Sequence, residues 1–483
     1  MQSNICRITV NKEKIISCSR GDNLYDVISG SGHIFIGNCG KRGTCNRCLV
    51  YDVGSGSYIR SCTYIVEGDM ELRVDTAGGD ICSSYEGQCV KATEATPKRL
   101  GVAVDLGTTT VAMELVDLES ESTIDVYSFM NPQIAYGSDV LSRIKHGSCA
   151  CGLSELRSCI VKKLSEGIMC MLKSLMDKQQ PYNMCESSSN LAGLVRRIVI
   201  SGNTTMLAIL NGFTLENLGA APFTIKNGDM AEFKGDSFFG TTELCDAEVI
   251  LLPNLSAFVG ADVLSGALIK GVFRDAGYKL FADLGTNGEL ILANKHGGFA
   301  TSCACGPAFE GILRRAGING TNAFDMLSIM KFSGILNDDG VLSDRYIEAG
   351  YKMPDGNIID MDMIHSFMLA KAAICAGVQA LISSMDISVD EVKTLYIAGG
   401  FGCNLNMNSA VSLGLLPAEL ANKAEYAGNT SLQGARKCLT DIDFIGKMEN
   451  LKSLVTPINL GELSGFEKDY YSHMNLRRWS ITQ

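Results

Sequence analysis

The chain has 483 residues, of which 46% are hydrophobic and 20% charged, and its formal net charge at pH 7 is −11. This composition is typical of a globular protein long enough for two to four domains. The acidic balance argues against non-specific binding to nucleic acid or to an anionic membrane surface.

The chain contains nineteen cysteines, scattered through both halves. Their number is odd, and the N-terminus "MQSNICRITVNKEK" alternates like a strand without the apolar core of a signal peptide. These features predict reduced thiols in a cytoplasmic protein, one that suits an anaerobe, rather than a disulfide framework. The most apolar helical stretch, residues 367–382, is too short to span a bilayer and is expected to be a buried core helix.

Residues 1–85 are predicted to form a small unit of strands around one helix. The segments "NICRITV" and "EKIISCSRG" read as two short strands, and "DNLYDVISGSG" reads as a helix that ends at its glycines. After Cys62, "TYIVEGDMELRV" predicts two further strands around "EGD". Together these elements indicate a β-grasp-like unit.

Four cysteines of this unit have the spacing of a metal site: Cys39, Cys45, Cys48 and Cys62. The spacing is close to the plant-type C-x4-C-x2-C with a distant fourth cysteine, which holds a 2Fe–2S cluster. Gly40 and Gly43 allow amides of the loop to turn inward toward the cluster sulfurs. Structural zinc, which usually takes two close-spaced pairs, is the alternative, and a site without metal is another.

The surroundings of these cysteines leave two smaller questions open. Lys41 and Arg42, beside the cysteine loop, are either solvated charges or a docking patch for an acidic partner. Cys6 and Cys18 lack the ligand spacing and are expected to be packing residues.

After a short polar link at residues 86–99, one design occurs twice. The segment "LGVAVDLGTTTVAMELVDL" (100–118) is a strand, a tight turn and a strand, and "YKLFADLGTNGELILAN" (278–294) repeats it. Each is followed by a strand that ends at glycine and opens a helix, in "RRIVISGNTTMLAIL" (196–210) and "VKTLYIAGGFGCNL" (392–405). The order of these elements predicts an internal duplication.

The residue types in the two turns point to phosphate chemistry. Glycine and threonine in a hairpin turn present backbone N–H and hydroxyl groups to a phosphate, and glycine permits a close approach. An aspartate at each turn can hold Mg²⁺, usually through water. Two such hairpins facing each other would clasp the β- and γ-phosphates of ATP, and the glycines after residue 398 leave room for adenosine at a helix N-terminus.

This arrangement resembles the superfamily that contains acetate kinase, sugar kinases and actin, with two ribonuclease-H-like halves and ATP between them. The resemblance implies an α/β fold with an N-terminal β-grasp ferredoxin unit (1–85), a linker (86–99) and a duplicated ATPase domain (100–483) whose halves are about 100–275 and 276–483. It implies catalytic roles for Asp105 and Asp283. The implied ATP-binding residues are Asp105, Gly107, Thr108, Thr109, Gly202, Asn203, Asp283, Gly285, Thr286, Asn287, Gly399, Gly400 and Gly402.

The whole chain resembles one family more closely, the reductive activators of corrinoid proteins. "CGKRGTCNRC" followed by "SCTYIVEGDMEL" is similar to their ferredoxin module. "NPQIAYGSDVLSRI" (131–144), "LPNLSAFVGADV" (252–263), "CGPAFEG" (305–311) and "LAKAAICAGV" (369–378) are similar to their ATPase domain. Many of these activators carry an extra domain between the two modules that is associated with pairing of subunits. Only the short link stands there in this chain, so a homodimer stays undecided.

The resemblance implies an ATP-dependent reductive activator. In that reading a 2Fe–2S cluster passes one electron to an inactive Co(II) corrinoid protein of a methyl-transfer system and restores Co(I). An upstream low-potential donor would reduce the cluster, and neither nucleic acid nor membrane would be a partner. Two alternatives remain: an ATP-coupled electron donor to another low-potential enzyme, and a redox-regulated small-molecule kinase. Cys303 and Cys305, near the second turn, are expected to be buried packing residues, with a redox or metal role as the alternative.

Overall fold

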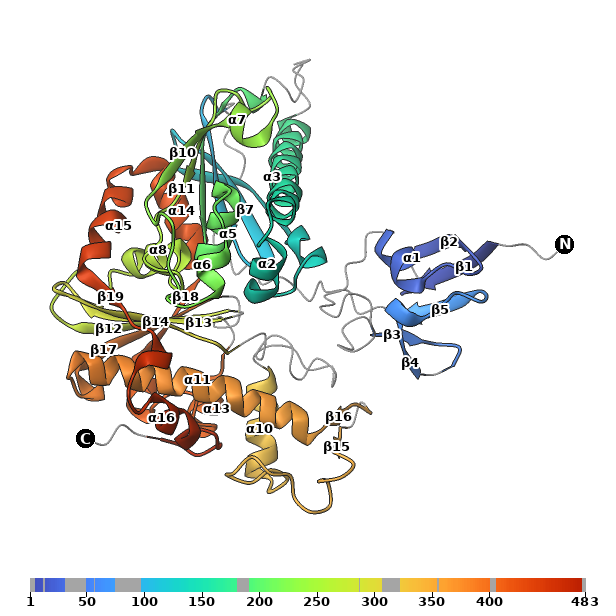
Figure 1. The fold of residues 1–483 in the computed structure, drawn as a ribbon, viewed down its shortest axis with the longest axis vertical. Coiled ribbons are helices and arrows are strands. Elements are labelled where there is room, and N and C mark those ends of the chain that lie inside the picture. The colour runs from blue at the N-terminus through green and yellow to red at the C-terminus, as the bar shows by residue number, and fades with distance from the viewer. Residues whose placement is uncertain are drawn as a thin grey trace.

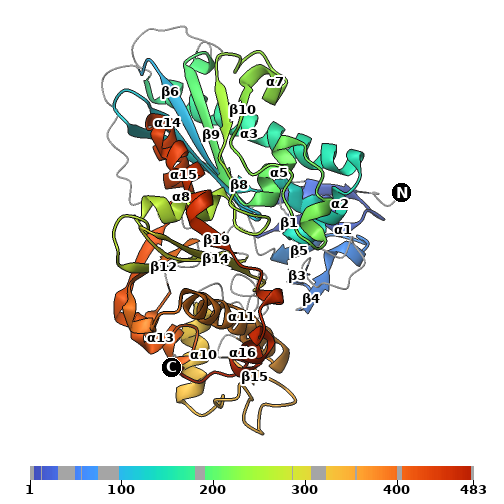
Figure 2. The same ribbon diagram turned by 60° about the vertical axis from the view of Figure 1, so that its left-hand side comes forward.

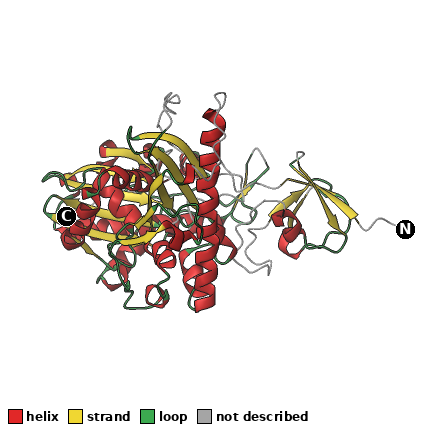
Figure 3. Cartoon of the chain, turned by 90° about the horizontal axis from the view of Figure 1, so that it is seen from above, coloured by secondary structure: helices red, strands yellow, loops and turns green. Residues whose placement is uncertain are grey.

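The structure is a computed structural model of the chain. It describes residues 5–11, 14–30, 49–55, 57–73, 97–179, 191–285, 287–305, 322–353, 356–399 and 405–479. These residues form one five-stranded sheet near the N-terminus and two six-stranded sheets, together with a small two-stranded one. In the ribbon the N-terminal unit is separate from the two larger sheets (Figures 1 and 3).

The N-terminal unit is a mixed sheet with its own apolar core. The strand order is β2-β1-β5-β3-β4, and β1 runs parallel to β5. Leu24 and Ile28 of the helix share a buried cluster with Ile8 and Leu72 of the sheet. The elements are β1 (Ile5–Val10), β2 (Lys14–Ser19), α1 (Leu24–Gly30), β3 (Leu49–Asp52), β4 (Ser57–Arg60), η1 (Ser61–Thr63) and β5 (Met70–Arg73).

Two expectations for this unit were incomplete. The segment around "EGD" contains one strand, β5, and not two, because Ile65 pairs only through an isolated bridge with Asn23. The hairpin of β3 and β4 was not predicted. Its sequence, "LVYDVGSGSYIR" (49–60), nevertheless contains the short alternating runs and the glycine turn of a hairpin.

The two larger sheets share one topology over five of their six strands, and the sixth lies at opposite edges, as β10 beside β11 in the first and β19 beside β14 in the second. The first has the order β10-β11-β9-β6-β7-β8, and the second has the order β18-β17-β12-β13-β14-β19. In each, a three-stranded meander is joined by a parallel strand from beyond a long helix, so β9 and β17 occupy equivalent places beside β6 and β12. The duplication predicted from the two turns is therefore present in the strand order. This strand order fits the superfamily of acetate kinase, sugar kinases and actin, whose two halves the sequence resembles.

The elements of the first repeat are β6 (Leu100–Leu106), β7 (Thr110–Asp117), β8 (Ser122–Met130), η2 (Pro132–Ala135), α2 (Val140–His146), α3 (Ala150–Gln179), β9 (Val195–Gly202), α5 (Thr204–Asn211), α6 (Glu216–Gly219), β10 (Ala231–Lys234), α7 (Gly235–Phe239), β11 (Glu248–Leu251) and α8 (Ala261–Ile269). Those of the second are β12 (Tyr278–Leu284), β13 (Gly288–Asn294), β14 (Gly297–Cys303), α10 (Asn322–Phe332), β15 (Tyr351–Lys352), β16 (Ile358–Ile359), α11 (Met361–Met385), η4 (Val389–Glu391), β17 (Val392–Ala398), α13 (Met407–Ser412), η5 (Ala418–Lys423), β18 (Ala424–Gly428), α14 (Thr430–Thr440), α15 (Asp443–Leu454), β19 (Val455–Pro457), η6 (Leu460–Glu462) and α16 (Phe466–Ser472).

Two helices cross between the repeats. Helix α14 follows β18 of the second sheet in sequence, but in the ribbon it lies beside β6 of the first (Figure 2). Its Leu432 and Leu439 are buried in the core of the first repeat. Helix α8 follows the first sheet, and its Val263 and Ala267 are buried with Phe281 of the second. Buried side chains of α15 also belong to the core of the first repeat, so each repeat contributes helical side chains to the core of the other.

The crossing of α8 and α14 depends on two glycines. A Cβ on Gly266 would lie 2.5 Å from Oγ1 of Thr430, and one on Gly434 would lie 2.5 Å from Oγ of Ser265. Such distances are well inside van der Waals contact, so only glycine allows the helices to approach this closely. The close crossing brings the N-terminal ends of α8 and α14 to the place where the sheets meet.

Helix α11 is the helix expected between residues 367 and 382. Among the described residues it is the one helix long and apolar enough to cross a membrane, but 78% of its most apolar window is buried inside the protein. Its side chains, such as Phe367 and Ile374, belong to the core of the second repeat. The helix has 25 residues, so the expectation that it is too short to span a bilayer was wrong, whereas its expected burial in the core is confirmed.

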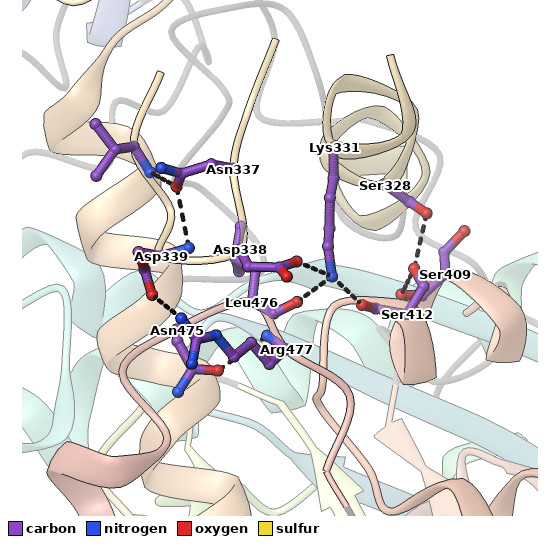
Figure 4. A network of polar contacts seen from close by, with 11 residues as sticks. Ser328, Lys331, Asn337, Asp338, Asp339, Ser409, Ser412, Asn475, Leu476 and Arg477 are labelled. Carbon is purple, nitrogen blue, oxygen red and sulfur yellow. Dashed lines mark hydrogen bonds and ion pairs between the residues drawn. The ribbon is translucent and has the colours of Figure 1, made fainter. Parts of the chain in front are cut away.

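The C-terminal segment is tied to this repeat by a polar network (Figure 4). Lys331 on α10 forms an ion pair with Asp338 at 3.0 Å and donates to the carbonyl oxygens of Ser412, at 3.0 Å, and of Leu476. The network joins α10, the end of α13 and the last described residues. Because the ammonium group replaces its water with three oxygen partners, this part of the fold is fixed in one arrangement.

Candidate functional site

The predicted turns lie at the same point of each repeat. Asp105 is the sixth residue of β6 and pairs with Ala112, and Asp283 is the sixth residue of β12 and pairs with Glu289. At the first turn, a Cβ on Gly107 would lie 2.4 Å from the carbonyl oxygen of Thr110, so the tight turn requires glycine.

The glycines that end the parallel strands make the same close contact in both repeats. A Cβ on Gly202 would lie 2.8 Å from the carbonyl oxygen of Leu106, and one on Gly399 would lie 2.8 Å from that of Leu284. Gly399 also has a φ of +86°, which a side chain disfavours. The backbone after each of these strands therefore passes directly against its hairpin turn.

Asn203 joins the first turn to the helix that follows Gly202. Its side-chain oxygen accepts the backbone N–H of Met206 at 3.0 Å and so caps α5, while its Nδ2 donates to Oγ1 of Thr108 at 2.9 Å. The cap thereby holds a hydroxyl of the predicted phosphate turn in place.

Four carboxyl groups gather where the repeats meet, from β6, α8, β12 and β13: Asp105, Asp262, Asp283 and Glu289. Burial, followed by the charges of Asp262 and Asp105, raises the pKa of Asp283 to about 8. Burial, with a smaller contribution from Asp105, raises the pKa of Asp262 to about 7. The pKa of Glu289 is raised well above its ordinary value by burial and by Asp262 and Asp283. Buried carboxyl groups of this kind favour a cation, because a nearby positive charge makes their ionisation less costly.

The N-terminus of α14 holds Asp105 from the opposite repeat. Asn429 Nδ2 donates to one carboxylate oxygen at 2.9 Å, and Ser431 Oγ donates to the other at 2.7 Å. Burial raises the pKa of Asp105, and these two hydrogen bonds act in the opposite direction. The crossing helix thus makes the position of a first-repeat carboxylate depend on the second repeat.

A buried arginine lies behind the first turn. Arg143 has no exposed surface, and it donates to the carbonyl oxygens of Thr108, at 2.6 Å, and Gly137, at 2.9 Å, and to Oε1 of Gln133 at 3.1 Å. Asn131 donates in the same way to the carbonyl oxygen of Gly107 at 2.8 Å. The carbonyl oxygens of Gly107 and Thr108 in the turn are therefore held in place from behind.

We expect Arg143→Lys to weaken ATP binding about tenfold, because one ammonium group cannot reproduce the planar fork that spans three acceptors. Isothermal titration with ATP and Mg²⁺ measures the change. Arg157→Lys is the matched control, because Arg157 is partly buried and donates to the carbonyl of Leu210, on α5. Equal affinities in Arg143→Lys and the parent would show that the turn does not depend on this support.

The raised pKa values predict a pH dependence. Because Asp262 and Asp283 hold protons in the folded form up to about pH 7 and 8, the folded chain binds more protons than the unfolded one between pH 4 and 8. Its stability without ligand should therefore decrease as pH rises from about 4 to about 8 and should level off above the folded pKa values. Magnesium nucleotide should stabilise the deprotonated form, so the gain in melting temperature on adding it should grow across the same interval. Thermal unfolding at several pH values, with and without Mg²⁺ and ATP, tests both trends. A gain independent of pH would contradict the assignment of these carboxylates to the site.

Part of the predicted site lies outside the described residues: Cys39, Cys45, Cys48, Thr286, Gly400 and Gly402. Cys62, the fourth predicted cluster ligand, is described and buried, on η1. Within the described part of the chain, no group of three or more His, Cys, Asp or Glu side chains is arranged to hold a metal ion directly. The predicted roles in cluster and nucleotide binding therefore stay predictions.

Cys303 and Cys305, at the end of β14, are buried beneath the second turn. Burial raises the pKa of Cys303 well above its ordinary value, so its thiol stays protonated. A Cβ on Gly377 of α11 would lie 2.4 Å from Sγ of Cys303. This packing agrees with the expectation that these two are core residues.

Several residues of this region were missed from the sequence: Asp262, Glu289, Asn131, Gln133, Arg143, Asn429 and Ser431. One signal was available, since "GNT" occurs at 202–204 and again at 428–430. In both places the asparagine caps a helix, and in both it holds a group of the first turn, Thr108 or Asp105.

Comparisons with known proteins agree with this geometry. Residues 100–275 match the family model described as the RACo middle region, and residues 277–331 and 313–482 match the C-terminal domain of RACo, the ASKHA domain. The chain is 27% identical over 464 residues to a protein of Eubacterium limosum named corrinoid activation enzyme RamQ, covering 84% of this chain and 74% of that one. It is 23% identical over 398 residues to the [Co(II) methylated amine-specific corrinoid protein] reductase of Methanosarcina barkeri, covering 71% and 70%. A solved reductive activator for a corrinoid, iron-sulfur protein has the same fold, with a TM-score of 0.68 at 22% identity over 98% of each chain.

Proposed function

The chain belongs to the family of reductive activators of corrinoid proteins, and we propose that it is an ATP-dependent member that delivers one electron from a 2Fe–2S cluster to an inactive Co(II) corrinoid protein. The observation that carries the proposal is the approach of Asp105 and Asp283, one beside each turn. Asp105 and Asp283 come from different repeats, yet they are close enough for the charge of one to raise the pKa of the other. Such a pair is suited to bind one nucleotide between two halves.

The residues present fit a magnesium nucleotide. The four carboxyl groups repel one another when ionised, and a divalent cation would relieve that repulsion. No three of these four described carboxyl groups converge as direct ligands. Mg²⁺ fits such a site, because this ion usually keeps several of its waters. When bound, Mg²⁺ neutralises charge on the β- and γ-phosphates.

Within this proposal the chain supplies the contacts to ATP. The N–H groups at Gly107, Thr108 and Thr109 and those of the second turn, Gly285, Thr286 and Asn287, would hold the phosphates from two sides. The backbone at Gly399, Gly400 and Gly402 would lie against adenosine, with Gly202 and Asn203 supporting the first turn. Asp105 and Asp283 would hold the hydrated ion and act as the catalytic carboxylates.

The cluster would be held by Cys39, Cys45, Cys48 and Cys62. The placement of Cys62 fits this role. It lies on η1, directly after β4, and its carbonyl oxygen accepts a hydrogen bond from Nδ2 of Asn23, just before α1, at 3.1 Å. Helix α1 ends at Gly30 and β3 begins at Leu49, so the segment with the other three cysteines starts and ends on this small unit. A bound 2Fe–2S cluster carries one electron at a time.

The need for ATP follows from the redox step. A plant-type 2Fe–2S centre lies at about −400 mV, and the Co(II)/Co(I) couple of a corrinoid lies lower, so the transfer is uphill. Each 100 mV costs about 2.3 kcal/mol per electron. Nucleotide can help only by binding one state of the complex better than another, and the crossing helices provide a contact that depends on how the repeats are placed.

This function implies three further features of the system. The partner is a corrinoid protein of a methyl-transfer system, an upstream low-potential donor reduces the cluster, and the protein works in the cytoplasm. Anaerobic reduction of Co(II) corrinoid protein, followed by its absorbance with and without ATP, tests the function. Equal rates in both conditions would contradict it, as would ATP hydrolysis that a corrinoid protein does not stimulate.

A further inference from the structure

Two exposed thiols touch at the junction of α2 and α3. The Sγ atoms of Cys149 and Cys151 lie 2.9 Å apart, and both residues are exposed. Cys149 immediately precedes α3, where its sulfur accepts the backbone N–H of Gly152 at 3.3 Å in the manner of a helix cap. Neither residue belongs to the predicted cluster or to the nucleotide site.

We propose that Cys149 and Cys151 form a thiol–disulfide exchange site that is oxidised by the disulfide of a low-molecular-mass thiol, and that its oxidation weakens ATP binding at the first turn. The pair has what exchange requires: two thiols in contact, both reachable from solvent, one of them at the N-terminus of a 30-residue helix. The second half of the proposal rests on the ATP site proposed above.

The exchange balances without any further reagent. The thiolate of Cys149 attacks one sulfur of a disulfide RS–SR, forming a mixed disulfide and releasing one RS⁻. The thiolate of Cys151 then attacks Sγ of Cys149 and releases the second RS⁻. The two protein thiols lose two protons and two electrons, and the incoming disulfide is reduced to two thiols.

The two cysteines are suited to different steps. The hydrogen bond from the Cys151 thiol and then the amide of Gly152 lower the pKa of Cys149, while the same contact raises the pKa of Cys151. Cys149 is therefore the attacking thiol and Cys151 the resolving one. A disulfide between residues this near in sequence gains little from loop closure, so it should be easily reduced again.

A chain of contacts links this turn of α3 to the phosphate turn. A Cβ on Gly152 would lie 2.0 Å from the carbonyl oxygen of His146, so the first turn of α3 sits directly on the end of α2. One turn further along α3, the carbonyl oxygen of Leu156 accepts a hydrogen bond from Nε2 of Gln133 at 3.1 Å. Gln133 in turn accepts from Arg143, which holds the carbonyl oxygen of Thr108. A disulfide would break the hydrogen bond from the amide of Gly152 to the sulfur of Cys149 and so disturb the first link in this series of contacts.

The exchange can be followed on one peptide. The purified full-length protein is equilibrated anaerobically with mixtures of reduced glutathione and glutathione disulfide, quenched with acid, alkylated and digested with trypsin. The tryptic peptide of residues 146–157, "HGSCACGLSELR", contains Cys149 and Cys151 and no other cysteine. We expect it to change from doubly alkylated to unalkylated and two hydrogens lighter as the disulfide fraction rises. In Cys151→Ser we expect glutathione to stay bound at Cys149.

The internal control is Cys170, which is exposed and is the only cysteine in the tryptic peptide of residues 164–173. It should remain alkylated where the 146–157 peptide is already oxidised. If the 146–157 peptide stays doubly alkylated until Cys170 carries glutathione, Cys149 and Cys151 have no special exchange chemistry and the proposal is overturned.

The effect on ATP is measured separately, by titrating the reduced and oxidised protein with ATP and Mg²⁺ after confirming an unchanged cluster spectrum. Coupling of this kind typically amounts to 0.5–2 kcal/mol, so we expect affinity to fall between about twofold and thirtyfold on oxidation. Cys149→Ser should bind equally well in both buffers. Unchanged affinity in the oxidised parent would overturn the link to the first turn. Absence of ATP binding in the reduced parent would instead refute the ATP site, and the peptide would still report the exchange.

Discussion

Replacement of Asp283 with alanine is expected to lower ATP-dependent reduction of the corrinoid partner by at least about a hundredfold, while the cluster still accepts an electron. The magnitude follows from the loss of a charged group that holds the metal ion at the reacting phosphates. Asp283 has two other carboxylates close enough to raise its pKa, so it lies at the centre of the charged region. The assay is optical detection of Co(I) under anaerobic conditions, with the cluster spectrum of the same sample recorded before ATP is added.

Asp275→Ala is the matched control. Asp275 lies just before β12, is exposed, and forms an ion pair with Lys279 at 2.7 Å. It is not one of the residues proposed to bind nucleotide. It should leave the rate of reduction within about twofold of the parent, as is usual for exposed ion pairs. If Asp283→Ala reduces the corrinoid as fast as the parent, ATP has no part in the transfer, and the redox-regulated kinase becomes the better hypothesis.

The sequence predicted those parts of the site that are local in the chain. A strand, a tight turn containing glycine and a second strand can be recognised within some twenty residues, and the same is true of a strand that ends at glycine before a capped helix. These patterns located Asp105, Asp283, Gly202 and Gly399 in equivalent places of two repeats. The geometry of each turn is decided by its own backbone, as the close approach at Gly107 shows.

The parts that were missed depend on how distant segments pack. Asp262 is one polar residue at the start of an apolar helix, and nothing in its neighbourhood tells that α8 crosses to the other sheet. Asn429 and Ser431 reach Asp105 only because α14 crosses in the opposite direction. Arg143 similarly looks like one of many basic residues on a helix until packing buries it behind Thr108. Tertiary contacts of this kind leave no periodic signal in the sequence.

The crossing helices also indicate how nucleotide could act on the rest of the molecule. Asp105 is fixed by hydrogen bonds from α14, and α14 is itself fixed to the first sheet, where Arg436 pairs with Glu114 at 3.1 Å. Asp283 and Glu289 lie on strands of the second repeat, so a movement of one repeat relative to the other would change their distances from Asp105. A ligand held by carboxylates of both repeats would in turn favour one relative placement, which is the condition for ATP to do work on a partner.

Replacement of Cys62 with alanine is expected to remove the visible absorbance of the cluster and all electron delivery, while ATP affinity stays within about twofold of the parent. A 2Fe–2S cluster needs four ligands, and alanine offers none. ATP binding should survive because the buried side chains around Cys62 form a separate apolar core, distinct from the cores of the two repeats. Absorbance, iron and sulfide content, and titration with ATP give the three readings on one preparation.

Cys6→Ala separates loss of a ligand from damage to the small core. Cys6 and Cys62 are equally buried, at 4% and 5% exposure, and both belong to the same apolar cluster. Shortening either side chain removes one sulfur from that core, and the two variants should lose similar stability, about 1 kcal/mol or somewhat more. Only Cys62→Ala should lose iron. If both variants lose it, the cluster depends on the packing of the unit rather than on Cys62 as a ligand. If neither does, or if the parent contains stoichiometric zinc without visible absorbance, the iron–sulfur assignment is wrong and electron transfer by this chain falls with it.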